Sequence, residues 1–158
     1  MQIGVLADTH LHSWPVALLA QVKELFAQAE LILHAGDIIN MSVLEELPGP
    51  VAAVAGNSDG PWVRSALPLS RIVEAKGFRI GLIHGYGPPG ETPARARSYF
   101  ADSRVDAVVF GHSHMAMAET VGGVLMFNPG SLSSPRDGIS SLGRLYLDKG
   151  IKAEIIRL

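Results

Sequence analysis

The sequence predicts an α/β fold in which two β-sheets pack against each other, and three observations lead to this prediction. Short apolar runs at 3–7, 31–35 and 51–55 each end in a polar loop, which is typical of strands buried on both faces. Segments with helical spacing of apolar residues separate these runs. The C-terminal part, residues 115–158, alternates short apolar runs with turn sequences, as antiparallel β-structure does. We therefore expect a parallel sheet with a second sheet packed on it.

The first half of the chain follows a strand, helix, strand order. Its predicted elements are a strand at 3–7, a helix at 15–30, a strand at 31–35, a short helix at 42–47 and a strand at 51–55. Pro15 suits a helix start because its missing N–H needs no partner there. Ser42 with Glu45 three residues later is the pattern of a capping box, which predicts the start of the short helix.

The second half begins with a predicted β-hairpin. Residues 71–75 and 78–83 are strand-like and flank the turn Lys76-Gly77. A helix is predicted from Thr92-Pro93 to about Ala101, because proline is favoured in the first helical turn. A strand is then predicted at 106–110, ahead of the antiparallel tail.

Five short polar motifs each follow a predicted strand. They are Asp8-Thr9-His10, Gly36-Asp37, Gly56-Asn57, His84-Gly85 and Gly111-His112-Ser113-His114. Open α/β sheets bind their ligands at the carboxyl ends of the strands, so these side chains are expected to converge. Carboxylate, amide and imidazole donors suit divalent first-row metals. The sequence therefore predicts a two-metal site, and the glycines beside the ligands indicate close backbone approach or positive φ.

Composition limits the class of protein. The 158 residues are 47% hydrophobic, which fits a single domain over residues 1–158. Lys and Arg number 13 against 15 Asp and Glu, and this balance does not favour a dedicated nucleic-acid-binding surface. Cysteine is absent, which excludes thiolate metal sites. No apolar run approaches membrane-spanning length and residues 1–7 lack the features of a signal peptide, so we expect no membrane association and a cytoplasmic location.

The joint motif set resembles the calcineurin-like metallophosphoesterase superfamily, and more closely its small YfcE-like phosphodiesterase branch, over nearly the whole chain. Asn128-Pro129-Gly130-Ser131 and Pro135-Arg136 match the tail of that branch. The resemblance implies a four-layer αββα sandwich, with two mixed sheets flanked by helices and the metal site at the C-terminal strand ends. It also implies two divalent metal ions. One set of ligands is Asp8, His10, Asp37 and His114, and the other is Asp37, Asn57, His84 and His112, with Asp37 as the bridge. We expect Mn²⁺, with Ni²⁺, Zn²⁺, Fe²⁺ or Mg²⁺ as alternatives.

The function implied by the resemblance is a metal-dependent phosphodiesterase. A metal-bridged hydroxide would attack the phosphorus of a small phosphodiester in line, with His10, Asp37 and Asn57 as catalytic residues. The resemblance also implies a homo-oligomer. The main alternative is a protein-interaction module with little or no catalysis. A scaffold subunit of the eukaryotic retromer is similar in fold and uses that fold to bind partner proteins. Nuclease and cyclic-nucleotide phosphodiesterase activities are further alternatives. The complete ligand set favours the enzyme.

Several residues near the motifs have two interpretations. Ser58 stands where many members of the superfamily have a histidine that assists the leaving group, so we expect activity on esters with good leaving groups, such as aryl diesters. His34 is interpreted as a buried support for Asp37, and His12 as a solvated loop residue. Four residues could contact the substrate or support the ligands, or belong to ordinary turns: Asp59, Tyr86, Ser131 and Arg136.

Overall fold

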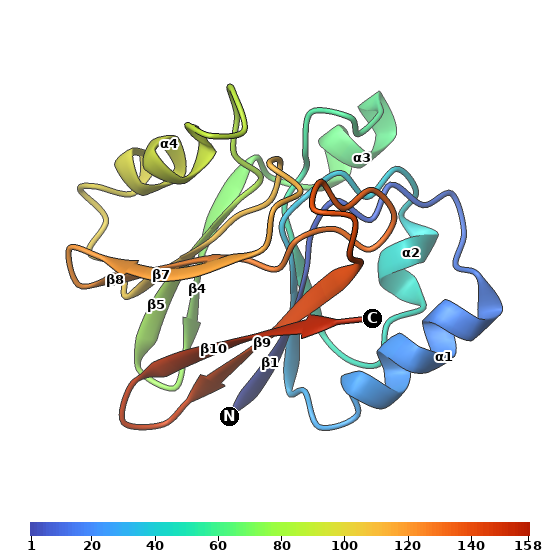
Figure 1. Cartoon of the computed structure of the whole chain (residues 1–158), viewed down its shortest axis with the longest axis horizontal. Coiled ribbons are helices and arrows are strands. Elements are labelled where there is room, and N and C mark those ends of the chain that lie inside the picture. Colours follow the sequence, from blue (N-terminus) through green and yellow to red (C-terminus); the bar gives the residue numbers. More distant parts are fainter.

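The computed structural model describes all 158 residues and contains ten strands and four helices (Figure 1). In chain order the elements are β1 (Gln2–Leu6), α1 (Val16–Leu25), β2 (Leu31–His34), α2 (Ser42–Glu45), β3 (Val51–Ala53), α3 (Pro61–Ala66), β4 (Ser70–Ala75), β5 (Phe78–Ile83), α4 (Thr92–Tyr99), β6 (Ala107–Val109), β7 (Met117–Val121), β8 (Val124–Asn128), β9 (Ser141–Leu147) and β10 (Ile151–Arg157). No helix has both the length and the apolar character needed to cross a membrane.

The strands form two mixed sheets of five strands each. The first has the order β10-β9-β1-β2-β3, in which β1, β2 and β3 are parallel and β9 runs antiparallel to β1. The second has the order β4-β5-β6-β8-β7, in which β5, β6 and β8 are parallel. The expected parallel arrangement is confirmed for β1, β2 and β3, although β9 and β10 make the first sheet mixed. The tail does not form a separate sheet, however, because β7 and β8 extend the second sheet and β9 and β10 extend the first.

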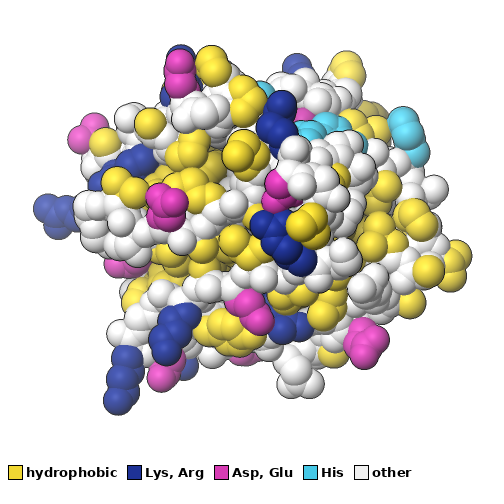
Figure 2. All heavy atoms as spheres, in the orientation of Figure 1, with side chains coloured by type: hydrophobic (Ala, Val, Ile, Leu, Met, Phe, Trp, Pro, Cys, Tyr) yellow, Lys and Arg dark blue, Asp and Glu magenta, His cyan; other side chains and the backbone are white.

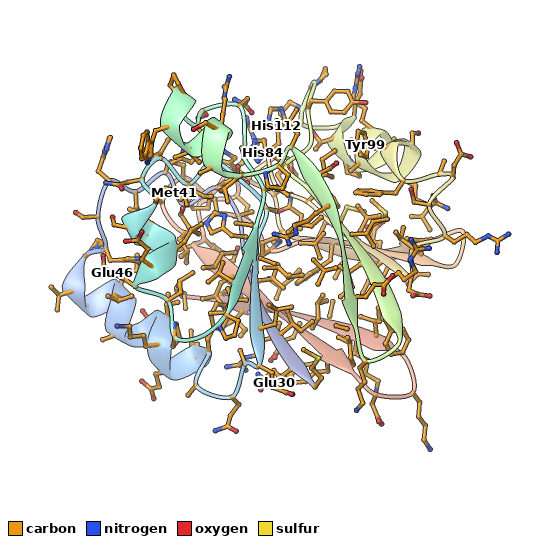
Figure 3. The ribbon with its side chains drawn as sticks, turned by 180° about the vertical axis from the view of Figure 1, so that it is seen from behind. Glu30, Met41, Glu46, His84, Tyr99 and His112 are labelled. Carbon is orange, nitrogen blue, oxygen red and sulfur yellow. The ribbon has the colours of Figure 1, made fainter.

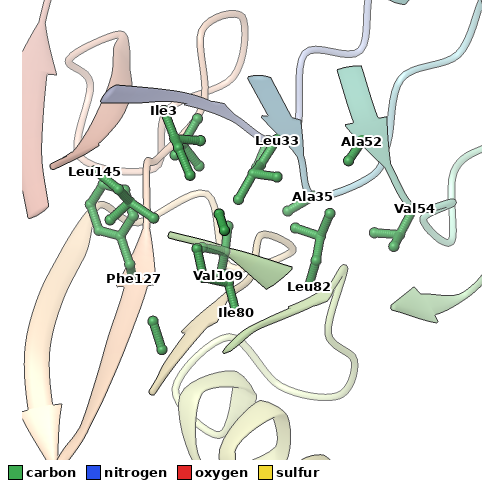
Figure 4. Packing of buried hydrophobic residues seen from close by; sticks show 14 of the residues in the cluster. Ile3, Leu33, Ala35, Ala52, Val54, Ile80, Leu82, Val109, Phe127 and Leu145 are labelled. Carbon is green, nitrogen blue, oxygen red and sulfur yellow. The ribbon is translucent and has the colours of Figure 1, made fainter. Parts of the chain in front are cut away.

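Two sheets with helices on their outer faces make four layers, as expected. Between the sheets, Ile3 and Leu33 belong to the same buried cluster as Ile80 and Val109 of the opposite sheet (Figure 4). Helices α1 and α2 pack on the outer face of the first sheet, and α4 packs on the outer face of the second.

On the outer face of each sheet, an aromatic ring at the end of a helix packs against a strand glycine. A Cβ at Gly4 of β1 would lie 2.8 Å from the ring of Phe26, and a Cβ at Gly81 of β5 would lie 2.8 Å from the ring of Phe100. Phe26 directly follows α1, and Phe100 directly follows α4. The absence of a side chain at each glycine therefore lets a helix end approach its sheet closely.

The predicted hairpin is confirmed, since Ala75 pairs with Phe78 across Lys76 and Gly77, both at positive φ (50° and 83°). The predicted capping box is wrong. Ser42 is already the first residue of α2, and its N–H is bonded by the Asn40 side chain at 3.2 Å. Helix α1 ends at Leu25, earlier than predicted. Helix α3 was not predicted.

Candidate metal centre

All five polar motifs converge at one end of the molecule. Asp8, Asp37 and Asn57 follow strands of the first sheet, whereas His84 and the His112–His114 segment follow strands of the second. Figure 3 shows His84 and His112 together at this end. Histidine side chains reach the molecular surface at the upper edge of Figure 2, next to a basic side chain. The site therefore lies where the two sheets meet.

The first ligand group consists of Asp8, His10, Asp37 and His114. One potential ligand atom from each lies within 4.8 Å of those from the others. The Nε2 atom of His10 lies 3.2 Å from Nε2 of His114 and 3.5 Å from Oδ2 of Asp37. The Nε2 atom of His114 also lies 3.3 Å from Oδ1 of Asp8. The structure thus brings together every residue expected for the first metal.

The second ligand group consists of Asn57, His84 and His112, again with Asp37. Oδ1 of Asn57 lies 3.0 Å from Nε2 of His84 and 2.8 Å from Nδ1 of His112. Oδ2 of Asp37 lies 3.4 Å from Nε2 of His84. This is the same carboxylate oxygen that faces His10, so Asp37 stands between the two groups.

Backbone carbonyls orient three of the histidines. Nδ1 of His84 donates to Ala35 O at 2.8 Å, Nε2 of His112 donates to Gly87 O at 2.8 Å, and Nδ1 of His114 donates to Ser134 O at 2.7 Å. In each neutral ring the other nitrogen then carries a lone pair, and that nitrogen points into the site. Hydrogen bonds of this kind fix the tautomer and ring orientation of metal-binding histidines.

These donor atoms fit cations. The lone-pair nitrogens of His84 and His112 lie 3.3 Å apart and both face the Asn57 carbonyl oxygen, an arrangement of acceptors that a positive charge relieves. Oδ2 of Asp8 is buried and has no hydrogen-bond partner. A buried carboxylate oxygen without a partner is costly unless a cation or donor satisfies it.

The pKa values of His84 and His114 also indicate that the site favours positive charge. Burial alone would lower the pKa of His84, but the nearby carboxylates of Asp37 and Asp8 favour its protonated form and outweigh burial, so the pKa is raised. The Asp8 carboxylate likewise favours the protonated form of His114 and raises its pKa against the opposing effect of burial.

Five of the seven ligand residues have a left-handed backbone. Their φ values are 50° for Asp8, 47° for His10, 56° for Asp37, 65° for His112 and 54° for His114. Such conformations cost about 1–3 kcal/mol each in non-glycine residues and cluster at functional sites. The fold therefore holds these loops in strained backbone conformations that position the ligand side chains.

Asp37 is fixed by the loop that follows β3. The Ser58 backbone N–H donates to Oδ1 of Asp37 at 2.7 Å, and the Ser58 hydroxyl donates to Oδ2 at 2.8 Å. A Cβ at Gly56 would collide with the Asp37 carboxylate. Burial would raise the pKa of Asp37, but the interaction with His84 and the hydrogen bonds from Ser58 outweigh it and the pKa is lowered. Asp37 is thus held as a carboxylate.

Asp59 ties two of the ligand loops together. Its carboxylate is buried and accepts the backbone N–H groups of Asp37, Ile38, Ile39 and Gly56 at 2.7–3.1 Å. Of the two interpretations offered for Asp59, the structure supports the positioning one.

The two remaining histidines lie outside the ligand groups. His34 is fully buried, its Nδ1 accepts the Gly36 N–H at 3.3 Å, and its Nε2 donates to the Thr9 hydroxyl at 3.1 Å. It therefore links the loops that carry Asp8 and Asp37. His12 is exposed, as expected of a solvated loop residue.

The tail motif supports the site from behind. The Asn128 side chain donates to Gly111 O at 2.9 Å, and the Ser131 hydroxyl donates to Asp8 O at 2.7 Å. The N–H of Gly130 is bonded to Oδ1 of Asn128, so it does not form an open anion-binding nest. Arg136 donates to Ser113 O at 3.1 Å. These bonds favour a supporting role over direct substrate contact.

Sequence reasoning missed the backbone acceptors of the histidines, because any residue can supply a carbonyl. It also missed Arg64 and Tyr99, which line a pocket of about 340 Å³ next to Asn57 and His84. Arg64 lies on the unpredicted helix α3, and Tyr99 lies at the end of α4. Neither belongs to a motif, so no local pattern indicated them.

Comparison with known proteins agrees with this geometry. A probable metallophosphoesterase of Methanothermobacter thermautotrophicus is 36% identical over 160 residues, covering 99% of this chain and 92% of that protein. The phosphodiesterase YfcE of Escherichia coli is 30% identical over 149 residues, covering 75% of this chain and 73% of that protein. Both names describe phosphoesterases.

Solved structures give the same picture. An archaeal phosphodiesterase superimposes with a TM-score of 0.81 at 25% identity and full coverage of both chains. Vps29 of Chaetomium thermophilum has a TM-score of 0.77 at 17% identity, covering 100% of this chain and 95% of that one, which shows a shared fold alone. The family model of the calcineurin-like phosphoesterase superfamily domain matches residues 1–150. The chain therefore belongs to the calcineurin-like phosphoesterase superfamily and is a phosphoesterase.

Proposed function

We propose that this protein is a divalent-metal-dependent phosphodiesterase that acts on small phosphate esters. The observation that carries the proposal is the meeting of two ligand groups, each drawn from loops of both sheets, at one carboxylate oxygen of Asp37. A carboxylate in this position suits a pair of cations about 3.5–4 Å apart.

We assign Asp8, His10, Asp37 and His114 to one cation and Asp37, Asn57, His84 and His112 to the other. When bound, the two cations would supply a hydroxide for in-line attack at neutral pH and neutralise the charge of the phosphoryl group. We expect Mn²⁺ to support activity, because the donors are oxygen and imidazole nitrogen without any thiolate.

The protein's own residues prepare this site before substrate arrives. Carbonyl groups hold the rings of His84, His112 and His114 with one nitrogen directed inward. The lowered pKa of Asp37 keeps it ionised, and the neutral Asn57 carbonyl limits negative charge near an anionic ester. Because His10, Asp37 and Asn57 are central to the two groups, we propose them as the catalytic residues.

Ser58 determines which esters we expect to react fastest. Its hydroxyl is committed to Asp37, and a hydroxyl is a poor proton donor near neutral pH. Without a general acid, hydrolysis depends on a leaving group that needs no proton. Aryl diesters should therefore react much faster than alkyl monoesters, and equal rates on the two would contradict this assignment.

The interaction-module alternative has weaker support. Its structural basis is the resemblance to Vps29, which shows the fold alone. Three of the large exposed apolar side chains, Leu69, Tyr86 and Tyr99, line the pocket beside Asn57 and His84 and so do not form a docking patch remote from the site. The two relatives found by sequence are named as a probable metallophosphoesterase and a phosphodiesterase, which favours the enzyme.

The test is hydrolysis of bis(p-nitrophenyl) phosphate by metal-stripped protein with Mn²⁺, Mg²⁺, Ni²⁺ or Zn²⁺ added back. We expect turnover only with added metal. Asp37→Asn should lose at least about a hundredfold in rate, because replacing residues that merely support metal ligands already costs about 10–100-fold. His12→Ala, a histidine change outside both groups, is the matched control and should retain wild-type activity. Absence of turnover with every metal, in protein shown to bind two ions, would favour the interaction module.

A further inference from the structure

A pocket of about 340 Å³ opens directly beside the second ligand group. It is lined by Asn57 and His84 of that group and by apolar and aromatic side chains, chiefly Leu69, Tyr86 and Tyr99. These three side chains are 71%, 47% and 51% exposed, although large apolar groups usually avoid water. Figure 3 shows Tyr99 at the same end of the molecule as His84.

The two tyrosines are held in place. The Arg95 guanidinium lies over the Tyr86 ring, 5.3 Å from its centre, and is itself bonded to Glu91 at 2.7 Å. The Tyr99 hydroxyl is hydrogen-bonded to the Ser70 hydroxyl at 2.8 Å. Exposed rings that are fixed in this way lose little conformational entropy when another ring packs on them.

Residues in the pocket wall, or next to it in the chain, are hydrogen-bonded to metal-ligand residues. Gly87, next to Tyr86, accepts the His112 ring N–H at 2.8 Å. Arg64, which also lines the pocket, donates to the backbone carbonyl of Asn57. Because Asn57 and His84 line the pocket, a group bound there would lie beside a phosphoryl group held at the ligand residues.

We propose that this pocket binds the aromatic organic group, an aryl ring or a nucleobase, of the phosphate ester. The inference rests on the proposed function, since it assumes that the phosphoryl group binds at the two ligand groups. A mainly apolar pocket with two tyrosines in its wall suits a planar ring better than a sugar or a short alkyl chain. Tyr86 and Tyr99 are then specificity-determining residues.

The experiment compares two phosphonates that cannot be hydrolysed, phenylphosphonate and methylphosphonate, by calorimetry on the Mn²⁺-loaded full chain. Both carry the same metal-binding group, so the ratio of their dissociation constants measures what the ring contributes. We expect wild-type protein to bind phenylphosphonate about tenfold more tightly, as ring stacking does elsewhere. The ratio should fall to about one to threefold in Tyr86→Ala and in Tyr99→Ala.

Conservative variants and a distant tyrosine serve as controls. Tyr86→Phe keeps the ring and should keep the ratio. Tyr146→Ala removes a partly exposed tyrosine on β9, outside the pocket, and should also leave it unchanged. A wild-type ratio near one, or a ratio that both alanine variants leave intact, would overturn the proposal. Because binding is read without turnover, selective binding by a protein that hydrolyses no ester would contradict only the proposed function.

Discussion

His34 illustrates how one buried residue can link acidity to stability. Burial is the main reason that its pKa is lowered from 6.5 to about 3, with the charge of His84 adding to the effect. The folded protein therefore keeps His34 neutral while the unfolded chain takes up a proton below pH 6.5. The stability associated with His34 is present above pH 6.5 and is lost as the pH falls toward 3, by about 1.4 kcal/mol per pH unit.

Replacing His34 should remove this acid sensitivity. An asparagine side chain does not titrate, while its amide oxygen could still accept the Gly36 N–H. We expect His34→Asn to be less stable than wild type at pH 7. When the pH is lowered from 7 to 5.5, the free energy of unfolding of this variant should fall by about 1 kcal/mol less than that of the wild type. Urea unfolding of metal-stripped protein at the two pH values measures the difference, and parallel losses in the two proteins would contradict the prediction.

Ser58 leads to a prediction about substrate range. An imidazole at this position can donate a proton near neutral pH, and positioned general acids accelerate such reactions by about 10²–10⁴. We expect Ser58→His to raise the rate on an alkyl monoester relative to an aryl diester by about tenfold or more. Ser58→Asn, which is polar but does not titrate, is the control. Equal rate ratios in the two variants would show that proton donation at this position is irrelevant.

At the scale of elements, Asp59 joins the loop after β2 to the loop after β3. Replacement by asparagine leaves only one side-chain oxygen for four backbone N–H groups. Since an unsatisfied buried donor costs about 1–3 kcal/mol, we expect Asp59→Asn to lose about 3 kcal/mol of unfolding free energy.

Asp59→Asn should also bind metal more weakly, because the loops that carry Asp37 and Asn57 would no longer be fixed relative to each other. Asp106→Asn is a matched control: the Asp106 carboxylate accepts a single backbone bond, from Arg79, at an exposed position. Asp106→Asn should lose less than about 1 kcal/mol of unfolding free energy. Chemical unfolding and Mn²⁺ titration measure both effects. If the two variants lost equal stability, Asp59 would not be the link that its bonds indicate.

The sequence predicted those elements whose pattern is local. For β1, β2 and the Lys76-Gly77 turn, the pattern that predicts the element lies within a few residues. Helix α3 has six residues and buries only Val63, so it lacks the repeated apolar spacing on which helix prediction depends. The division of the tail between two sheets was also out of reach, because the choice between β1 and β6 as a neighbour depends on contacts distant in sequence.

The ligand residues could be predicted for a related reason. A polar side chain directly after a buried strand stands out in the sequence, and parallel strands place their carboxyl ends at one edge. The supporting interactions could not be predicted. Ala35, Gly87 and Ser134 act through backbone carbonyls, and the bonds from Asn128 and Ser131 join loops that are remote in sequence.

At the scale of the whole molecule, the ligand residues connect the two sheets. Asp8, Asp37 and Asn57 come from loops of the first sheet, and the three histidines His84, His112 and His114 come from loops of the second. The sheets otherwise hold together through the apolar cluster between them. Ions bound by both sets of loops would close this end of the sandwich.

Metal binding should therefore stabilise the fold as a whole. An ion present at a hundred times its dissociation constant stabilises the folded state by about 2.7 kcal/mol, which raises the Tm of a chain of this length by about 5–11 °C. We expect Mn²⁺ to produce such a shift and EDTA to reverse it. Asp37→Asn should show a much smaller shift, because Asp37 contributes to both groups. His12→Ala should respond like wild type. Scanning calorimetry with and without metal measures the effect. Stoichiometric metal binding that left the Tm unchanged would contradict the prediction, because it would mean that the unfolded chain binds the ions as tightly as the folded one.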